Sequence, residues 1–399
     1  MNTNILFIFI GITIIFSILL ERGVARFKSP AILAYILAGA IIGPGALGLV
    51  QLQDIQVLNF INVLTLALIG FNVGSELRIS ELKKMGSSII TIVIFETLLT
   101  WLVVFLGTSI ILKSIPMGII YGALAAATAP AGTVDVIRQY KAQGKLTSTL
   151  FAVMGIDDIL ALIIFSISIP IARLLIVKGQ FTLMNSLLHA GGEIVFSVGI
   201  GVLSGFILYY VARKIHNKNM MLLLSIGVLF FHCGIAEKFR LSPILINMST
   251  AIVLVNKSAI ISRKFSGVYT EWAPPIYLLF FALIGTRMNI FVIWNYIPII
   301  VVYILTRTAG KFSGAYVGCS IAKSPKIIKT NLGYTLLSQA GVAIGLTYGA
   351  VKLLEEAKLF SCADQVINVM TSTTFLIMLI GPVLVKYGLN NAGEIKVNE

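Results

Sequence analysis

Long apolar segments alternate with short polar connections along the whole chain. A helix that crosses a bilayer needs about 20 mostly apolar residues, with a range of about 17–25. The segments that fit this length or come close to it are 4–20, 30–50, 57–77, 87–112, 116–134, 148–170, 187–212, 219–236, 243–256, 273–292, 294–320, 330–351 and 365–386. Of these, 243–256 is short, and only a polar patch at 286–289 separates 273–292 from 294–320. The pattern predicts an all-α polytopic membrane protein with about 13 transmembrane helices.

The composition excludes several classes of protein. Of the 399 residues, 58% are apolar and 12% are charged, whereas a soluble domain carries about 25% charged residues. So few charges cannot cover a water-facing surface, which argues against a soluble enzyme, a disordered chain and a nucleic-acid-binding domain. The net charge of +14 is therefore assigned to membrane loops rather than to a nucleic-acid partner, and the expected surroundings are the lipid bilayer.

The distribution of Lys and Arg predicts the orientation of the chain. Connections that follow the odd-numbered helices, together with the C-terminal tail, carry 20 of the 30 basic residues, and the other side carries 8. By the positive-inside rule, the N-terminus lies outside and the C-terminus lies in the cytoplasm, with the protein in the cell membrane. The first segment lacks the basic start and the cleavage site of a signal peptide, so we expect it to be retained.

We expect residues 1–399 to form a single membrane transport domain. The tail after the last segment is too short for a soluble regulatory domain. The three cysteines lie far apart, and no His/Cys cluster has metal-ligand spacing. We therefore predict neither a disulfide nor a zinc site, and no cofactor.

A weak internal repeat links the two halves of the chain. Residues 26–33 open the second segment with Arg-Phe-Lys-Ser-Pro, and residues 238–245 open the ninth with Lys-Phe-Arg-Leu-Ser-Pro. Their prolines, Pro30 and Pro243, are 213 positions apart, and seven helices separate the two copies. An odd number of crossings means that the copies enter from opposite sides, which is typical of the inverted-topology repeats of secondary transporters.

Two segments contain residues that weaken a helix. Pro130 lacks a backbone donor and disfavours helix at the residue before it, and with Gly132 it predicts a break over 128–132. The twelfth segment has a matching weak point at Gln339 and Gly341, and Gly341 follows Pro130 by 211 positions, close to the repeat offset. Broken helices expose carbonyls and half-helix ends that bind ions near the midplane of the membrane.

Ionisable residues inside the segments are the candidates for function, because a charge at the bilayer centre costs about 2.5–3.5 kcal/mol. Asp157 and Asp158 lie in the middle of 148–170. Successive helix residues point about 100° apart, so one carboxylate can face an aqueous cavity while the other faces a neighbouring helix. Their joint ionisation is unfavourable unless a cation lies beside them. The pair therefore predicts a site where protons compete with a cation.

Arg307 and Lys311 are spaced i, i+4 and lie on one helix face. Small residues flank Lys311 and allow another helix to approach closely, and we expect an aspartate of 148–170 to be its partner. A buried lysine can lose its proton, whereas an arginine effectively cannot. Lys311 is thus the candidate for proton transfer and Arg307 a fixed charge, with either a direct role or a structural pairing. Glu96 is a further candidate partner for either of them.

Several motifs, in this order and spacing, are familiar: SPAILAYILAGAIIGPGALG, LIGFNVGSEL, ATAPAGTVDVI, GIDDILALIIF, GKFSGAYVG and LLSQAGVAIGL. On these motifs the chain resembles bacterial and archaeal sodium/proton antiporters of the second family of the cation:proton antiporter superfamily, over nearly its whole length. The resemblance implies a homodimer with a dimerisation part and a core part, the core helices lying approximately at 87–170 and 294–386. It also implies elevator-type alternating access and two broken helices that cross in the core.

The resemblance also implies roles for single residues. Asp158 would be the main ligand of Na⁺ and H⁺, Asp157 would pair with Lys311 when Na⁺ is absent, and Thr128 would lie at the crossing. Some relatives carry an acidic residue after that threonine, whereas this chain has Ala129. Backbone carbonyls, Thr133 or water would have to complete the ligand shell.

These residues favour a transporter and argue against an enzyme. By the family pattern, adjacent aspartates favour electrogenic exchange of Na⁺ or Li⁺ for H⁺, with a role in pH homeostasis. A K⁺/H⁺ antiporter and an electroneutral Na⁺/H⁺ exchanger are the alternatives on the same fold. An intramembrane aspartyl protease needs carboxylates that share a proton across a cleft, which adjacent residues of one helix cannot provide. A passive channel would pass cations without coupling to protons.

Overall fold

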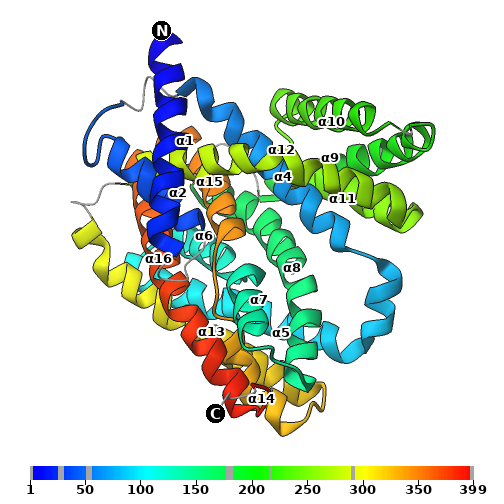
Figure 1. Cartoon of the computed structure of the whole chain (residues 1–399). Helices are drawn as coiled ribbons and strands as arrows, with labels where there is room; N and C mark the ends of the chain where they lie inside the picture. The colour runs from blue at the N-terminus through cyan, green and yellow to red at the C-terminus, as the bar shows by residue number, and fades with distance from the viewer. Residues whose placement is uncertain are drawn as a thin grey trace. The chain divides into compact units, whose positions relative to one another are not determined.

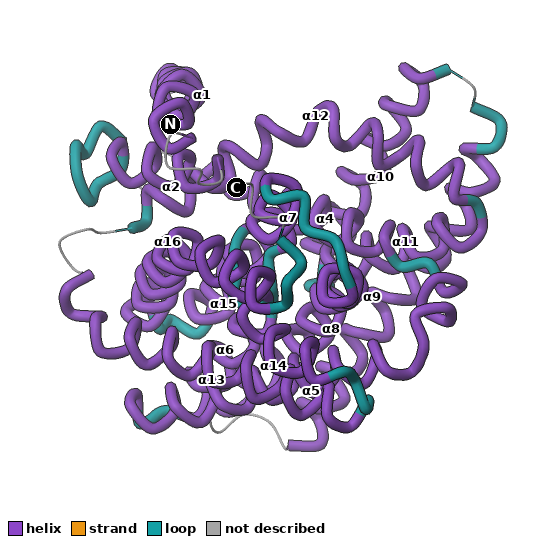
Figure 2. The backbone as a smooth tube through the Cα atoms, turned by 60° about the horizontal axis from the view of Figure 1, so that its bottom comes forward, coloured by secondary structure: helices purple, strands orange, loops and turns teal. Residues whose placement is uncertain are grey.

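The computed structural model describes residues 3–25, 31–50, 56–176, 183–215, 217–288 and 293–395. Within these ranges the chain consists of helices joined by turns and loops (Figure 2). Eight of the described helices are long and apolar enough to cross a membrane. The first copy of the repeated motif, up to Pro30, lies largely outside the described residues.

Figure 1 labels the helices along the chain. They are α1 Thr3–Ala25, α2 Ala31–Ile42, α4 Asn59–Glu76, α5 Ile79–Leu112, α6 Ile115–Ala126, α7 Pro130–Gln139, α8 Lys145–Ile176, α9 Leu183–Ala212, α10 Lys218–Phe239, α11 Pro243–Lys257, α12 Ala259–Thr286, α13 Ile297–Ile321, α14 Lys326–Thr335, α15 Gly341–Glu356 and α16 Phe360–Asn391. Short 3₁₀ turns at Gln56–Leu58 and Ile293–Tyr296 precede α4 and α13. Each predicted segment corresponds to one helix or to a pair of half-helices, which confirms the predicted all-α membrane fold.

Some boundaries differ from the prediction for local reasons. The segment expected at 30–50 ends as a helix at Ile42, because Gly43-Pro44-Gly45 follows as a turn. α5 contains a kink at Gly86, whose φ of 79° lies in the left-handed region that favours glycine. The apolar part of α5 therefore starts at the kink, as the segment 87–112 predicts. α12 begins well before the expected 273 and continues through Pro274 and Pro275.

The chain divides into two compact units. The first comprises Met1–Ile14, Val50–Lys84 and Phe181–Phe281, and the second comprises Ile15–Leu49, Met85–Gln180 and Ala282–Glu399. In the first unit, α11 begins at Pro243 after Ser242, whose hydroxyl caps the helix by accepting a hydrogen bond from Leu245 N. α11 packs there against α4 and α9. The second unit contains α5 from Met85 onward, α6 to α8 and α13 to α16, and hence every ionisable candidate residue.

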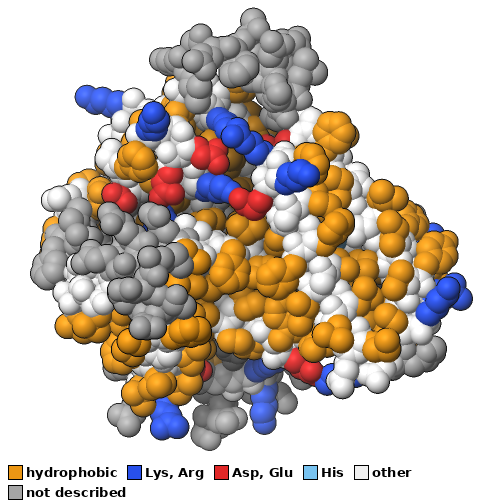
Figure 3. Space-filling model, turned by 90° about the horizontal axis from the view of Figure 1, so that it is seen from above, with side chains coloured by type: hydrophobic (Ala, Val, Ile, Leu, Met, Phe, Trp, Pro, Cys, Tyr) orange, Lys and Arg blue, Asp and Glu red, His pale blue; other side chains and the backbone are white. Residues whose placement is uncertain are grey.

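Large apolar side chains lie on the surface of both units. Figure 3 shows broad areas of hydrophobic side chains on one face, with charged side chains gathered in separate groups. Phe7, Ile110 and Trp294, for example, are 72%, 76% and 75% exposed. Monomeric soluble proteins seldom expose contiguous apolar areas of this kind, so this surface fits a lipid environment.

The packing of α5 against α13 agrees with the predicted inverted repeat at one pair of glycines. A Cβ atom on Gly318 of α13 would lie 2.8 Å from Ile92 Cα of α5. In the reverse sense, a Cβ atom on Gly107 of α5 would meet the Thr306 side chain of α13. The two glycines are 211 positions apart, the same offset that relates the breaks. Each helix thus presents a glycine to the other in a pseudo-symmetric manner.

Candidate functional site

The two broken helices of the second unit form the frame of the site. α6 ends at Ala126 and α7 begins at Pro130, while α14 ends at Thr335 and α15 begins at Gly341. The first break is thus at 127–129 rather than at the predicted 128–132, and Gly132 lies inside α7. Pro130 starts α7 because its missing N–H is not needed at the first helical position. Gln339 lies in the second break, as predicted, and Gly341 opens the half-helix after it.

The breaks contact each other directly. The Ala129 amide donates to the Ser338 carbonyl over 2.9 Å. The buried Thr133 hydroxyl lies 3.2 Å from Ser338 Oγ and 3.3 Å from the Thr335 carbonyl. These contacts bring two segments about 200 residues apart in sequence to one point, as the crossing of broken helices requires. Thr133 is committed to this junction, which it helps to hold together.

Arg307 binds the carbonyls that both breaks leave without helical partners. Its guanidinium donates to the carbonyls of Ala125 at 3.1 Å, Ala127 at 2.9 Å, Leu337 at 2.6 Å and Ser338 at 3.4 Å. The partners that the structure gives Arg307 are thus backbone carbonyls rather than Glu96. The rigid, planar guanidinium with five donors suits such a set of acceptors.

Gln339 adds a further link between the breaks. Its side-chain amide donates to the Leu124 carbonyl of α6 at 3.1 Å and to the Tyr303 hydroxyl of α13 at 2.9 Å. The rings of Tyr303 and Tyr121 pack edge to face, with centroids 6.0 Å apart. The second break is therefore anchored to α6 and α13 by buried polar contacts that the sequence alone did not reveal.

Lys311 lies one turn beyond Arg307 on α13 and is fully buried. Its ammonium donates to the Ala126 carbonyl at 2.8 Å and to the Thr128 hydroxyl at 2.7 Å, both at the first break. It forms ion pairs with Glu96 Oε1 at 2.5 Å and Asp157 Oδ2 at 3.5 Å. The aspartate partner expected from α8 is thus present, but Glu96 of α5 is nearer.

Glu96 reaches Lys311 because α5 and α13 approach very closely. A Cβ atom on Gly314 would lie 2.6 Å from Glu96 Cα, so a side chain there would hold the helices apart. Small residues around Lys311 predict a close helix approach, and the approaching helix is α5 rather than α8. Hydropathy does not distinguish these helices, so the sequence indicated Glu96 only as one candidate among several.

The two aspartates differ in their surroundings. Asp157 is fully buried and accepts a hydrogen bond from the Thr97 hydroxyl at 3.0 Å, whereas Asp158 is partly exposed. Thr97 also lies 3.3 Å from Glu96 Oε2, so it links the two carboxylates that share Lys311. Thr97 is a site residue that the sequence analysis missed. Its position next to Glu96 in an apolar helix was the available signal.

The cluster has a defined charge. With every group ionised, Glu96, Asp157 and Asp158 bring three negative charges, and Lys311 and Arg307 bring two positive ones. Carbonyl dipoles surround Arg307, and Lys311 is paired with two carboxylates. The arrangement leaves one negative charge for a cation or a proton to neutralise. Asp158 is the least buried of the three acidic residues, although its Oδ1 atom is itself buried.

This combination defines a class of protein. A multi-pass membrane protein whose discontinuous helices meet beside buried, paired ionisable groups has the architecture of a secondary ion transporter. The chain belongs to the sodium/hydrogen exchanger family, whose transmembrane model matches residues 6–387.

Two relatives and a solved structure are similar to this chain. A Na⁺/H⁺ antiporter of Enterococcus hirae is 24% identical over 371 residues, which cover 91% of this chain and 92% of the relative. Cation/H⁺ antiporter 19 of Arabidopsis thaliana is 25% identical, and the match covers 82% of this chain but 43% of that longer protein. The sodium proton antiporter MjNhaP1 of Methanocaldococcus jannaschii at pH 8 shares the fold, with a TM-score of 0.76, 17% identity and 97% of both chains covered.

Proposed function

We propose that this protein is a secondary active transporter that exchanges Na⁺ or Li⁺ for H⁺ across the cell membrane. The observation that carries the proposal is the shared ion pair of Lys311 with Glu96 and Asp157, beside the partly exposed Asp158 and at the meeting point of two broken helices. Family membership and the antiporters among its relatives support the same activity.

In the proposed cycle, Na⁺ and H⁺ compete for Asp158. A deprotonated Asp158 binds Na⁺, and Asp157 turns from Lys311 toward the ion. Glu96 holds Lys311 meanwhile, because it is the nearer carboxylate. Proton uptake by Asp158 and Asp157 expels the ion, and the neutral Asp157 carboxyl then meets Lys311 through a hydrogen bond; the ion pair forms again when Asp157 loses its proton. Because this site cannot hold Na⁺ and H⁺ at the same time, the transport of one ion is coupled to the transport of the other.

The remaining ligands of Na⁺ come from the breaks in this proposal. The Thr128 hydroxyl already accepts a hydrogen bond from Lys311 and has a second lone pair for the ion. Thr133 and Ser338 hold the junction together, and the carbonyls of the first break or water complete the shell. Ala129 offers no side-chain oxygen.

We propose elevator-type alternating access for the movement. The whole ionisable cluster belongs to one compact unit of the chain, so it can be displaced as a body. The proposed protein is a homodimer with its N-terminus outside and its C-terminus in the cytoplasm, in line with the family resemblance and the loop charges.

Proton uptake by two carboxylates per Na⁺ would make the exchange electrogenic. One observation favours the electroneutral alternative. Glu96 pairs with Lys311 at 2.5 Å, and a lysine whose charge is always compensated need not change its pairing during the cycle. Exchange of one Na⁺ for one H⁺ on Asp158 would then suffice.

The first test is to measure Na⁺-triggered currents and internal pH in proteoliposomes. Asp158→Asn is the inactivating variant, and Glu356→Gln, which removes an exposed ion pair with Arg173, is the matched control. We expect a transient Na⁺ current that reverses with the proton gradient, disappears in Asp158→Asn and persists in Glu356→Gln. Full Na⁺-driven proton movement in Asp158→Asn would refute the assigned site.

The same preparation separates the alternatives. A Na⁺-dependent pH change without current would establish electroneutral exchange and overturn the two-proton cycle. A larger response to K⁺ than to Na⁺ or Li⁺ would identify a K⁺/H⁺ antiporter. Cation flux without a pH change would identify a channel.

A further inference from the structure

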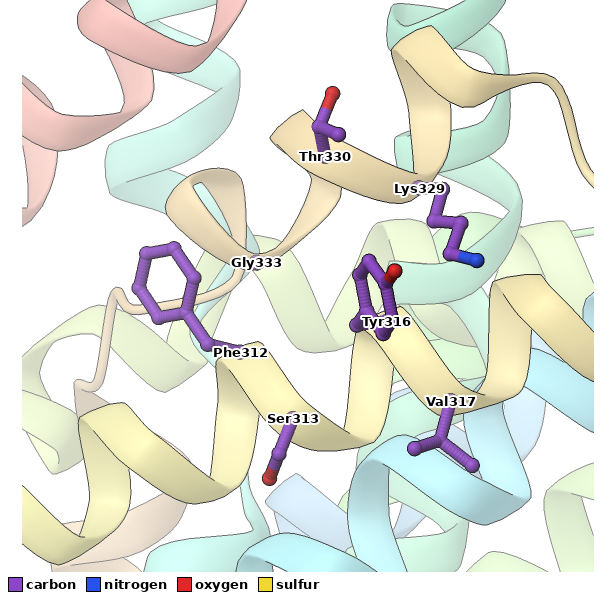
Figure 4. Close-up of a pocket in the computed structure, with 7 residues that line it drawn as sticks. All are labelled: Phe312, Ser313, Tyr316, Val317, Lys329, Thr330 and Gly333. Atoms are coloured by element: carbon purple, nitrogen blue, oxygen red, sulfur yellow. The ribbon is translucent and has the colours of Figure 1, made fainter.

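An open cavity is lined by residues of α13 and α14 (Figure 4). Its volume is about 400 Å³, and its lining is mostly apolar. The lining residues are Phe312, Ser313, Tyr316 and Val317 of α13 and Lys329, Thr330 and Gly333 of α14. Lys311 and Gly314 alternate with these residues along α13, but both are buried. This part of α13 therefore has one face to the ion site and another to the cavity.

The packing of the two helices determines the ends of the cavity. At one end α14 contacts α13, where a Cβ atom on Gly333 would lie 2.9 Å from the Phe312 ring. At the other end lies Lys329, whose ammonium is 4.2 Å from the centroid of the Tyr316 ring. The lining is thus apolar beside Phe312 and carries a cation at Lys329.

None of the residues that line the cavity is acidic, so the lining offers the Lys329 ammonium no carboxylate partner. Lys323 and Lys326 precede Lys329 closely, and the sequence contains no Asp or Glu between Glu271 and Glu355. In the described chain, the charged group of Lys329 contacts the Tyr316 ring. Cation–π contact contributes about 0.5–1 kcal/mol at an exposed site and leaves the positive charge uncompensated. The charge complements an anion.

The surroundings of the cavity indicate where that anion comes from. Tyr316, Ile321 and Ile327 are 50%, 52% and 39% exposed, as expected for side chains that face lipid. A tyrosine and lysines next to such residues are typical of the membrane–water interface. Basic pockets between transmembrane helices bind anionic lipid headgroups.

We propose that the cavity is a binding site for an anionic phospholipid. The phosphate lies at the Lys329 ammonium, and an acyl chain lies against the Phe312, Tyr316 and Val317 side chains. The lipid stabilises the contact of α13 with α14. α13 carries Arg307 and Lys311, and α14 leads directly into the second break, so lipid binding supports the helix pair that holds the ion site.

The test uses the purified full-length protein in neutral detergent, with its melting temperature followed against added lipid. Phosphatidylglycerol is the probe, and phosphatidylcholine and inorganic phosphate are the comparisons. We expect phosphatidylglycerol to raise the melting temperature saturably, and phosphatidylcholine and inorganic phosphate to leave it unchanged. Lys329→Gln should weaken it about fivefold, the equivalent of about 1 kcal/mol per lysine near an anionic membrane surface. Ser313→Phe should fill the cavity and weaken binding while keeping every charge.

Lys386→Gln is the matched control, because Lys386 also lies over an aromatic ring, that of Tyr140, at 4.8 Å but lines no part of this cavity. It should bind phosphatidylglycerol as the unmodified protein does. Equal stabilisation by phosphatidylcholine, by inorganic phosphate, or by phosphatidylglycerol in both Lys329→Gln and Ser313→Phe would overturn the proposal. The readout is binding, so it stands or fails separately from transport.

Discussion

Lys311 has two carboxylate neighbours at different distances, which predicts unequal contributions to stability. Glu96 lies at 2.5 Å and Asp157 at 3.5 Å, and Asp157 also accepts a hydrogen bond from Thr97. Removing one partner of a buried ion pair costs about 3–5 kcal/mol. We expect Glu96→Gln to lower the free energy of unfolding by about 3 kcal/mol and Asp157→Asn by clearly less. Denaturant unfolding of the purified protein measures both, and equal losses would contradict this assignment.

A double-mutant cycle isolates the pair itself. If Glu96 and Lys311 interact as the geometry indicates, the combined Glu96→Gln and Lys311→Gln variant loses less stability than the sum of the single variants. Contacting residues typically show interaction energies of about 0.5–3 kcal/mol in such cycles. Strict additivity would mean that the two charges do not interact.

Arg307 allows charge to be separated from geometry. Its guanidinium bridges carbonyls of both breaks, among them Ala127 and Leu337. A lysine keeps the positive charge but has no planar fork of donors. We therefore expect Arg307→Lys to lower the melting temperature by several degrees and to reduce Na⁺-dependent proton movement strongly. Unchanged stability and transport would show that charge alone is sufficient at this position.

At the scale of elements, the contact of α5 with α13 depends on glycine. A Cβ on Gly314 would lie 2.6 Å from Glu96 Cα, and overpacking costs about 1–3 kcal/mol. Gly314→Ala should therefore destabilise the protein despite the better helix propensity of alanine. Gly227 of α10 has no neighbour within 4 Å of its Cβ direction, so Gly227→Ala should be neutral or stabilising. Thermal unfolding of both variants tests this contrast, which equal effects would refute.

The start of α8 depends on a residue near the other end of the chain. The Glu394 carboxylate accepts hydrogen bonds from the amides of Leu146 and Thr147 at 2.6 and 2.8 Å, and from the Thr147 hydroxyl at 2.7 Å. A carboxylate at a helix N-terminus both caps the amides and complements the helix dipole. This contact connects the segment that follows α16 to the helix that carries Asp157 and Asp158.

We expect Glu394→Ala to cost about 1–2 kcal/mol and to accelerate hydrogen exchange of the first turn of α8. Glu394→Gln should have a smaller effect, because the amide oxygen can still accept. Glu356→Gln, at an exposed ion pair, should change stability by less than about 1 kcal/mol. Unchanged exchange at the start of α8 in Glu394→Ala would show that the cap is dispensable.

At the scale of the whole molecule, hydropathy predicted the helices well because each crossing needs its own apolar segment. The breaks were also predictable, since Pro130 and the Gln339–Gly341 region conflict with a continuous helix. The site's partners were harder to predict. Which face of α5 meets Lys311 depends on glycine packing between helices, and which acceptors bind Arg307 depends on carbonyls that exist only once both breaks have formed. A sequence pattern indicates neither.

The orientation of the molecule in the membrane is the last prediction, and two residues test it under matched conditions. Lys113 and Lys141 are both exposed and follow helices with φ of 49° and 47°, so Lys113→Cys and Lys141→Cys introduce similar strain. The positive-inside rule places Lys113 outside and Lys141 in the cytoplasm.

In a background without Cys233, Cys319 and Cys362, a membrane-impermeant maleimide should label Lys113→Cys in intact cells and Lys141→Cys only after permeabilisation. The reverse pattern would invert the topology. Labelling of both in intact cells would place the two turns on the same side, against the single crossing that α6 and α7 make between them.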